Sequence, residues 1–162
     1  SPIGELVVVT RGGVVCAIAF GRRYDGLERG LERRFARIDW SDAPADGAAT
    51  TALGRYFDGD VRALEPLAAD PGGSPFQRAV WDVLRRIPPG ETRSYLDVAR
   101  RVGKPDAVRA VARANATNPV PLIIPCHRVI GADGSLTGFG GGLDRKRWLL
   151  RHEAAGVEFA LR

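Results

Sequence analysis

The strongest constraints on the fold lie between residues 74 and 115. Ser74-Pro75-Phe76-Gln77 combines a serine N-cap, a proline at the first helical position and a glutamine that can close a capping box. Ser94-Tyr95-Leu96-Asp97 is a second capping box, and Gly103-Lys104-Pro105 breaks the chain after it. The pattern predicts helices over 75–87, 95–102 and 106–115. Two short helices joined by a tight turn with glycine are typical of a helix-turn-helix, although two ordinary core helices would give the same pattern.

The first half of the chain has a different pattern. Residues 3–9 and 14–20 are rich in β-branched residues and flank Arg11-Gly12-Gly13, which predicts a hairpin. Cys16 lies in the second run, where we expect it to be a small core residue. Apolar residues at every fourth position predict a helix over 25–37, and a second is expected over 48–57. Asp70-Pro71-Gly72-Gly73 is the predicted boundary between an α/β domain (residues 1–73) and a mainly helical domain (residues 74–162).

Composition and charge exclude several classes of protein. The chain is 44% hydrophobic and 27% charged, unlike a disordered protein. Residues 1–75 carry 9 basic and 11 acidic side chains, whereas residues 76–162 carry 15 and 8. This asymmetry suggests that the second half meets a polyanion, with a solvated basic face as the alternative. No apolar run approaches the roughly 20 residues of a membrane span, and no secretory signal is recognisable, so a cytoplasmic protein is expected.

Cys126-His127 is the first candidate reactive pair. A thiol is a poor nucleophile at neutral pH until a base helps to remove its proton, and a carboxylate can fix the histidine tautomer. Adjacent residues seldom point the same way in regular structure, so a bridging water or a turn would be required. A core thiol beside a satisfied histidine is the simpler interpretation. The only histidines are His127 and His152, and no CxxC or HxxxH cluster is present, so no structural zinc is expected.

Two further features carry open alternatives. Glu153, near the end of a helix expected from an Asp144 N-cap, could assist His127 or form a surface ion pair of little weight. The glycine-rich run 138–142 could cradle a phosphate, but without a GK[ST] motif a mobile or closely packed loop is the better interpretation.

Together, these motifs resemble the O6-alkylguanine-DNA alkyltransferases. The heptad Pro125-Cys126-His127-Arg128-Val129-Ile130-Gly131 looks like the active-site signature of that family. The resemblance is continuous over about residues 74–153, and it is loose over residues 1–73, through Pro2-Ile3-Gly4 and Tyr56-Phe57-Asp58-Gly59. The supporting motifs are Ser74-Pro75-Phe76-Gln77, Val80-Trp81, Ile87-Pro88-x-Gly90, Arg109-Ala110-Val111, Asn118-Pro119 and Trp148-Leu149-Leu150-x-His152-Glu153.

The resemblance implies a fold and a reaction. The fold is a ribonuclease-H-like α/β N-terminal domain followed by a helical, winged-helix-like domain with a helix-turn-helix. The reaction moves an alkyl group from O6 of guanine, or O4 of thymine, in double-stranded DNA onto the protein's own cysteine, once and without a cofactor or metal. The family resemblance also implies a monomer in the prokaryotic cytoplasm, associated with the nucleoid.

Site residues follow from the same resemblance. Cys126 matches the alkyl acceptor, His127 and Glu153 match a relay that acts through a water, and Asn118 matches the residue that orders the turn. Tyr95 matches a tyrosine that binds the flipped base, and Arg109 matches an arginine that fills the vacated stack. The remaining expected substrate contacts are Val129, Phe139 and Gly140, and the remaining expected DNA contacts are Arg100, Arg101, Lys104, Ala110, Arg113 and Arg128.

Three positions depart from the family pattern. Phe139 stands where tyrosine is common, Gly140 where serine is common, and Asn115-Ala116-Thr117 where small Gly or Ser residues are common. These differences bear on the range of alkyl groups accepted. Two other functions remain open at this point: a helix-turn-helix module that binds the lesion without repairing it, and a Cys-His hydrolase with multiple turnover.

Overall fold

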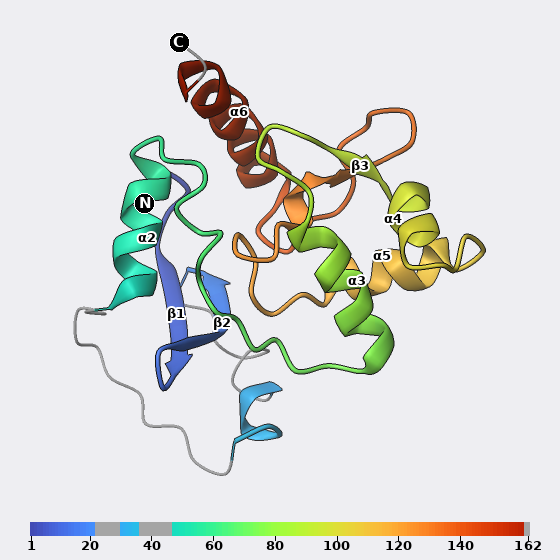
Figure 1. The fold of residues 1–162 in the computed structure, drawn as a ribbon, viewed down its shortest axis with the longest axis horizontal. Coiled ribbons are helices and arrows are strands. Elements are labelled where there is room, and N and C mark those ends of the chain that lie inside the picture. The colour runs from blue at the N-terminus through green and yellow to red at the C-terminus, as the bar shows by residue number, and fades with distance from the viewer. Residues whose placement is uncertain (22–29, 36–46, 161–162) are drawn as a thin grey trace.

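The computed structural model describes residues 1–21, 30–35 and 47–160 of the 162-residue chain. Figure 1 shows α2 and the β1–β2 hairpin on one side, α3, α4 and α5 on the other, and α6 along the top edge. The elements, in chain order, are β1 (Leu6–Arg11), β2 (Val14–Phe20), α2 (Ala48–Phe57), α3 (Pro75–Arg85), β3 (Arg93–Ser94), α4 (Tyr95–Arg101), α5 (Val108–Ala116), the 3₁₀ turn η1 (Cys126–Arg128), β4 (Val129–Ile130) and α6 (Leu143–Ala160).

The predicted hairpin and the helix over 48–57 are confirmed. Strands β1 and β2 pair antiparallel, with Leu6 opposite Phe20 and an irregularity between Val9 and Thr10. Cys16 is buried in β2 and packs in a small apolar cluster with Leu31, as expected. The helix predicted over 25–37 falls mostly outside the described residues, although residues 30–32 are helical.

Both capping boxes form. The Ser74 hydroxyl accepts a hydrogen bond from the Gln77 amide, and Ser94 does the same for Asp97, so α3 and α4 begin where the sequence predicts. Helix α5 begins at Val108, two residues later than expected, and its N-cap Ala107 supplies no side-chain hydrogen bond. Helices α4 and α5 are thus joined by residues 102–107, in a helix-turn-helix arrangement.

Two features differ from the sequence predictions. Strands β3 and β4 form a parallel pair, Arg93 with Val129 and Ser94 with Ile130, that was not predicted because two-residue strands leave no periodic signal. The expected Asp144 N-cap is wrong: Asp144 is already the second residue of α6 and pairs with Arg147. The parallel pair ties the start of α4 to the residues that follow Cys126.

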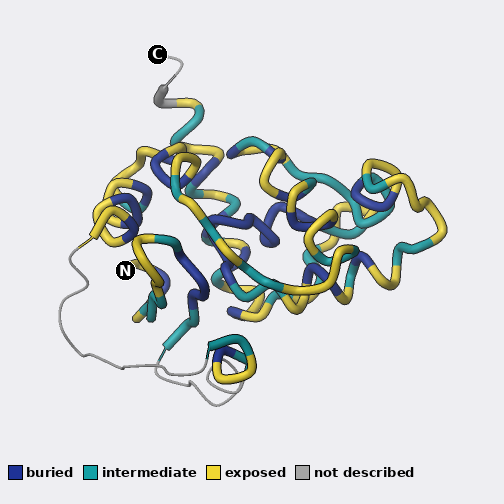
Figure 2. The backbone as a smooth tube through the Cα atoms, turned by 60° about the horizontal axis from the view of Figure 1, so that its bottom comes forward, coloured by how far each residue is buried: buried dark blue, intermediate teal, exposed yellow. Residues whose placement is uncertain are grey.

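One buried core joins the two halves of the sequence. Its largest cluster includes Val15 and Tyr56 from the first half and Trp81 and Leu149 from the second, and buried backbone lies centrally in Figure 2. A backbone hydrogen bond of 2.8 Å from Ile18 N to Pro119 O also crosses the predicted boundary. The hairpin therefore packs directly against the segment that leads to Cys126. Within the described ranges, no helix combines the length and apolarity needed to cross a bilayer.

Candidate active site

A rigid turn delivers Cys126 to the interior. Asn118 holds this turn from both sides of its amide: Nδ2 donates to Ile124 O at 2.8 Å, and Oδ1 accepts from Val120 N at 3.0 Å. Leu122 is buried with a φ of 75°, a conformation that a branched residue adopts only when its surroundings enforce it. Asn115, not singled out as a site residue from sequence, donates from Nδ2 to Cys126 O at 3.4 Å. The thiol therefore sits on a backbone fixed by two amide side chains.

The 3₁₀ turn places His127 on a buried carboxylate. His127 Nε2 lies 2.8 Å from Glu153 Oε1, and both side chains are fully buried, so Glu153 does not form a surface ion pair. Because an ionised carboxylate only accepts hydrogen bonds, Nε2 carries a hydrogen. In the neutral ring, Nδ1 is then the basic nitrogen. It is buried and has no hydrogen-bond partner among the protein groups of the described ranges.

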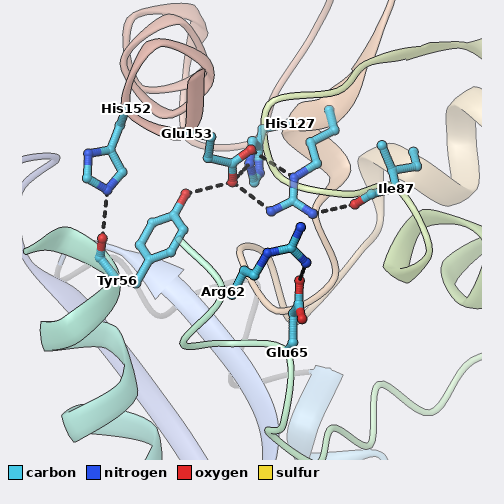
Figure 3. Close-up of polar contacts among 8 residues, drawn as sticks. Tyr56, Arg62, Glu65, Ile87, His127, His152 and Glu153 are labelled. Atoms are coloured by element: carbon cyan, nitrogen blue, oxygen red, sulfur yellow. Dashed lines mark hydrogen bonds and ion pairs between the residues drawn. The ribbon is translucent and has the colours of Figure 1, made fainter. Parts of the chain in front are cut away.

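Glu153 accepts hydrogen bonds from two segments of the chain, η1 and α2. Arg128 donates from Nε to Oε2 and from Nη2 to Oε1, both at 2.8 Å, and Tyr56 donates from its hydroxyl to Oε1, also at 2.8 Å. Figure 3 shows Tyr56 pointing at this carboxylate from the side opposite His127. Burial alone would raise the pKa of Glu153, but His127 and Arg128 hold that pKa well below its ordinary value. Glu153 is therefore a charged, fixed acceptor.

The expectation that Arg128 contacts DNA is wrong. Its side chain is buried, and besides the two bonds to Glu153 it donates from Nη1 to Ile87 O at 2.5 Å. All three nitrogen atoms of the guanidinium are engaged inside the protein. Sequence reasoning counted Arg128 with the surface arginines because its partner, Glu153, lies 25 residues away in sequence and is brought close only by the fold.

Cys126 is a buried, protonated thiol at rest. Burial raises its pKa to about 11, although a hydrogen bond from Asn118 and the positive charge of Lys146 act in the opposite direction. Burial likewise lowers the pKa of His127, against the influence of Glu153, so the imidazole is neutral at physiological pH. A neutral base and a neutral thiol thus lie next to each other in sequence, and each would become charged by moving one proton.

Lys146 was missed by the sequence analysis. Its Nζ is buried and donates to Val129 O at 2.6 Å and to Thr137 O at 2.9 Å. Lys146 stands between Arg145 and Arg147 in a basic run that looks solvated, so no sequence signal marks it as internal. The amine braces the loop that leads to Phe139, and its positive charge favours the Cys126 thiolate.

A cavity of about 900 Å³ opens onto the thiol. Asn118, Cys126, Phe139 and Gly140 all line it, together with residues of the hairpin and of α3. The Phe139 ring contacts Phe20 edge-on, with centroids 5.4 Å apart. A side chain at Gly141 would collide with both of these rings, whereas one at Gly138, Gly140 or Gly142 would meet no atom within 4 Å, so the glycine run is closely packed at Gly141.

Two expected substrate residues lie outside the lining of that cavity. Tyr95, the first residue of α4, accepts a hydrogen bond from Thr137 Oγ1 at 3.0 Å, so it contacts the same loop two residues before Phe139. Val129 is fully buried in β4, where its carbonyl receives Lys146. Both residues therefore contact the groups behind the cavity wall and not the cavity itself.

A basic, exposed face covers the helix-turn-helix arrangement. Lys104 Nζ lies 5.8 Å from the centre of the Phe76 ring, and Arg100 approaches Asp97 at 3.9 Å. Such exposed pairs are weak, so they leave the charges available to a polyanion. The exposed residues on α4, the turn and α5 that the sequence assigned to DNA are Arg100, Arg101, Lys104, Arg109, Ala110 and Arg113. No group of three or more metal-ligating side chains occurs within the described ranges.

Comparison with known proteins agrees with this geometry. Residues 75–155 match the family model described as the 6-O-methylguanine DNA methyltransferase DNA-binding domain. The chain is 43% identical over 162 residues to the methylated-DNA–protein-cysteine methyltransferase of Mycolicibacterium paratuberculosis, covering 97% of this chain and 93% of that protein. The Salmonella typhimurium protein of the same name is 40% identical over 156 residues, covering 94% and 91%.

Solved structures show the same relationship. A crystal structure of Mycobacterium tuberculosis OGT in complex with DNA aligns with a TM-score of 0.79 and 40% identity, covering 96% of this chain and 90% of that one. The O6-methylguanine-DNA methyltransferase of Pyrococcus kodakaraensis aligns with a TM-score of 0.65 and 27% identity, covering 91% and 90%. This chain therefore belongs to the methylated-DNA–protein-cysteine methyltransferase family.

Proposed function

We propose that this protein repairs alkylated DNA by taking the alkyl group of O6-alkylguanine onto Cys126, once per molecule. The observation that carries the proposal is the buried sequence Cys126-His127 with Glu153 on His127 Nε2, because it leaves Nδ1 as a buried base on the residue that follows a buried thiol. The relatives named as methylated-DNA–protein-cysteine methyltransferases support the reaction class.

Proton transfer starts the reaction. In this proposal a water bridges Cys126 Sγ and His127 Nδ1 and carries the thiol proton to the imidazole, which removes the difficulty that the two residues are adjacent. Glu153 stabilises the imidazolium that results, and Lys146 and Asn118 stabilise the thiolate. Because burial raises the pKa of the resting thiol to about 11, the thiolate is scarce before this transfer.

The group transfer itself balances without a cofactor. The thiolate attacks the alkyl carbon, a carbon–sulfur bond forms, and the bond from that carbon to O6 breaks with its electron pair going to guanine. Tyr95 donates a hydrogen bond to the leaving base, and the proton lost by the thiol ends on guanine. The thioether is stable, so the protein is consumed in the reaction.

DNA binding presents the lesion. An O6-alkyl carbon inside a duplex cannot be reached by a buried thiol, so the base must be extruded, at a cost of a few kcal/mol. We propose that Arg109 fills the vacated stack, with Ala110 beside it against the groove. Arg100, Arg101, Lys104 and Arg113 neutralise phosphates, which gives affinity without sequence readout. Their exposure on one helical unit supports this assignment.

An intact-mass measurement tests the function. Incubation with an oligonucleotide that contains O6-methylguanine should add one methyl group to the wild-type protein and none to Cys126→Ser. Cys16→Ala is the matched control, since Cys16 is the only other cysteine, and it should gain the methyl group as the wild type does. A gain on Cys126→Ser, or no gain on the wild type, would overturn the proposal. Repeated turnover of an ester or amide would instead favour a hydrolase.

Several finer expectations belong to the same proposal. The first domain, residues 1–73, is ribonuclease-H-like, and the second, residues 74–162, is winged-helix-like, to which the short β3–β4 pair beside α4 and α5 lends support. O4-alkylthymine is a second substrate, and the protein acts in the bacterial cytoplasm as a monomer at the nucleoid. Phe139 and Gly140 give the cavity an apolar wall and an open position, which bears on the size of alkyl group accepted.

A further inference from the structure

Two neighbouring residues of α6 hold one tyrosine of α2 at both ends. Glu153 Oε1 accepts from the Tyr56 hydroxyl at 2.8 Å, and His152 Nε2 donates to the Tyr56 carbonyl at 2.7 Å. Figure 3 shows Tyr56 lying between these two side chains. Tyr56 is only 1% exposed, and the His152 ring stacks on Trp148 with centroids 4.6 Å apart, so the clamp is rigid.

This contact reaches the atom that orients His127. Glu153 Oε1 accepts hydrogen bonds from the Tyr56 hydroxyl, His127 Nε2 and Arg128 Nη2, whereas Oε2 accepts one from Arg128 Nε. Each donor to a carboxylate oxygen fixes its position and shares its negative charge. Tyr56 is a permanent donor there, because burial and then Glu153 raise its pKa well above the ordinary value for tyrosine. The hydroxyl therefore acts on the same oxygen that His127 uses.

We propose that Tyr56 is a positioning residue of the alkyl-transfer site, through which the α/β half of the chain sets the carboxylate that orients His127. This inference rests on the proposed roles of Cys126, His127 and Glu153. It gives residues 1–73 a role in the chemistry beyond support, since α2 supplies a donor that helices of the second half do not.

The contact also tunes when His127 can accept a proton. The charged and titratable groups around the imidazole are Glu153, Arg128, Lys146 and Cys126, with Tyr56 acting through Glu153. By sharing the charge on Oε1, the hydroxyl weakens the pull of Glu153 on an imidazolium, so His127 stays neutral at lower pH. Without the hydroxyl, His127 holds a proton at higher pH and is unavailable as a base over a fraction of the working range.

Tyr56→Phe isolates this effect because it keeps the ring and removes only the hydroxyl. We would measure the single-turnover rate of Cys126 alkylation by a free O6-alkylguanine between pH 5 and pH 9, so that DNA binding plays no role. The expected result is about a tenfold slower reaction near pH 6, a shift of the rising limb to higher pH, and recovery towards the wild-type rate near pH 9. Nuclear magnetic resonance titration of the two histidines should show the same upward shift for His127.

Val61→Ala is the matched control. Val61 is buried in the same half of the chain and makes no hydrogen bond to Glu153, so this variant loses stability without touching the carboxylate. It should show the wild-type pH profile at temperatures where it is folded. Should Tyr56→Phe fail to fold, His152→Phe replaces it. This variant releases the Tyr56 carbonyl but keeps the hydroxyl, so it should give a smaller shift in the same direction.

The outcomes separate the two proposals. A wild-type protein that takes no alkyl group overturns the proposed function. The role of Tyr56 is overturned if the wild type is active and the pH–rate profile of Tyr56→Phe is unchanged, or is lowered by the same factor at every pH. A purely structural contribution would not depend on the protonation of His127.

Discussion

Arg128 offers the sharpest test of how the site is built. Arg128→Met keeps most of the aliphatic volume and removes the guanidinium, which makes two hydrogen bonds to Glu153 and one to Ile87 O. Because Glu153 is fully buried, the loss leaves a charge with only His127 and Tyr56 as partners. Removing one member of a buried ion pair costs about 3–5 kcal/mol. That is a large fraction of the roughly 5–15 kcal/mol by which a domain of this kind is stable.

Urea unfolding followed by tryptophan fluorescence measures the loss. Arg113→Met, exposed on α5, is the matched control and should change stability by no more than about 0.5 kcal/mol. For DNA binding we expect the reverse, with an effect of Arg113→Met and none of Arg128→Met. Arg113→Met should reduce the slope of log affinity against log salt concentration by about 0.9, whereas folded Arg128→Met should leave it unchanged.

An Arg128→Met protein that is as stable as the wild type and also has a lower salt slope would place Arg128 at the DNA and contradict its burial beside Glu153. Where Arg128→Met is too unstable to purify, Arg128→Lys replaces it. Lysine keeps one donor but cannot span both carboxylate oxygens, so a smaller loss of stability in the same direction is expected.

Three further predictions concern the site. The pKa of Glu153 is lowered in the folded protein. The contribution of this carboxylate to stability is therefore complete above the ordinary carboxyl pKa of about 4.3, and it is lost as pH falls through the folded value. The Tm should drop steeply in acid, and the drop should be shallower in Glu153→Gln. The pKa of about 11 for Cys126 implies a thiolate fraction at pH 8 that is about a hundred times smaller than in the unfolded chain. In the Cys16→Ala protein, a disulfide reagent should therefore label Cys126 far more slowly before urea is added than after. Equal labelling rates would contradict the burial of the thiol. Asn118→Ala removes two hydrogen bonds of about 1 kcal/mol each, so unfolding should show a loss of about 2 kcal/mol together with slower alkylation. Thr51→Ala, at an exposed position of α2 away from the site, should show neither.

Local structure was largely predictable because its signals are local. Each capping box, at Ser74 and at Ser94, spans only a few consecutive residues and marks the start of a helix, α3 or α4. The β-rich runs around Arg11-Gly12-Gly13 mark the hairpin. Predictions were wrong or absent where the signal was short or ambiguous. Asp144 is a good N-cap residue, but helix α6 begins one residue before it. The two-residue strands β3 and β4 are too short to show an alternation of apolar and polar residues.

Charge was the least reliable guide at the level of single residues. The sequence places Arg128 and Lys146 in basic runs, where a solvated position is the natural expectation, yet both are buried and donate to groups inside the protein. The general inference of a basic face survives, because the exposed arginines of α4 and α5 remain where the polyanion was expected.

Residue types at short spacing were enough to predict the candidate pair Cys126-His127, the helix-turn-helix unit and the family resemblance. Which groups meet at the buried carboxylate of Glu153 emerged only from the packing of the fold. Glu153, Tyr56 and Arg128 come from α6, α2 and η1, and they meet because burying apolar surface brings these elements together. A buried carboxylate must collect donors from whatever packs around it, and which donors those are depends on distances across the fold that no short motif records.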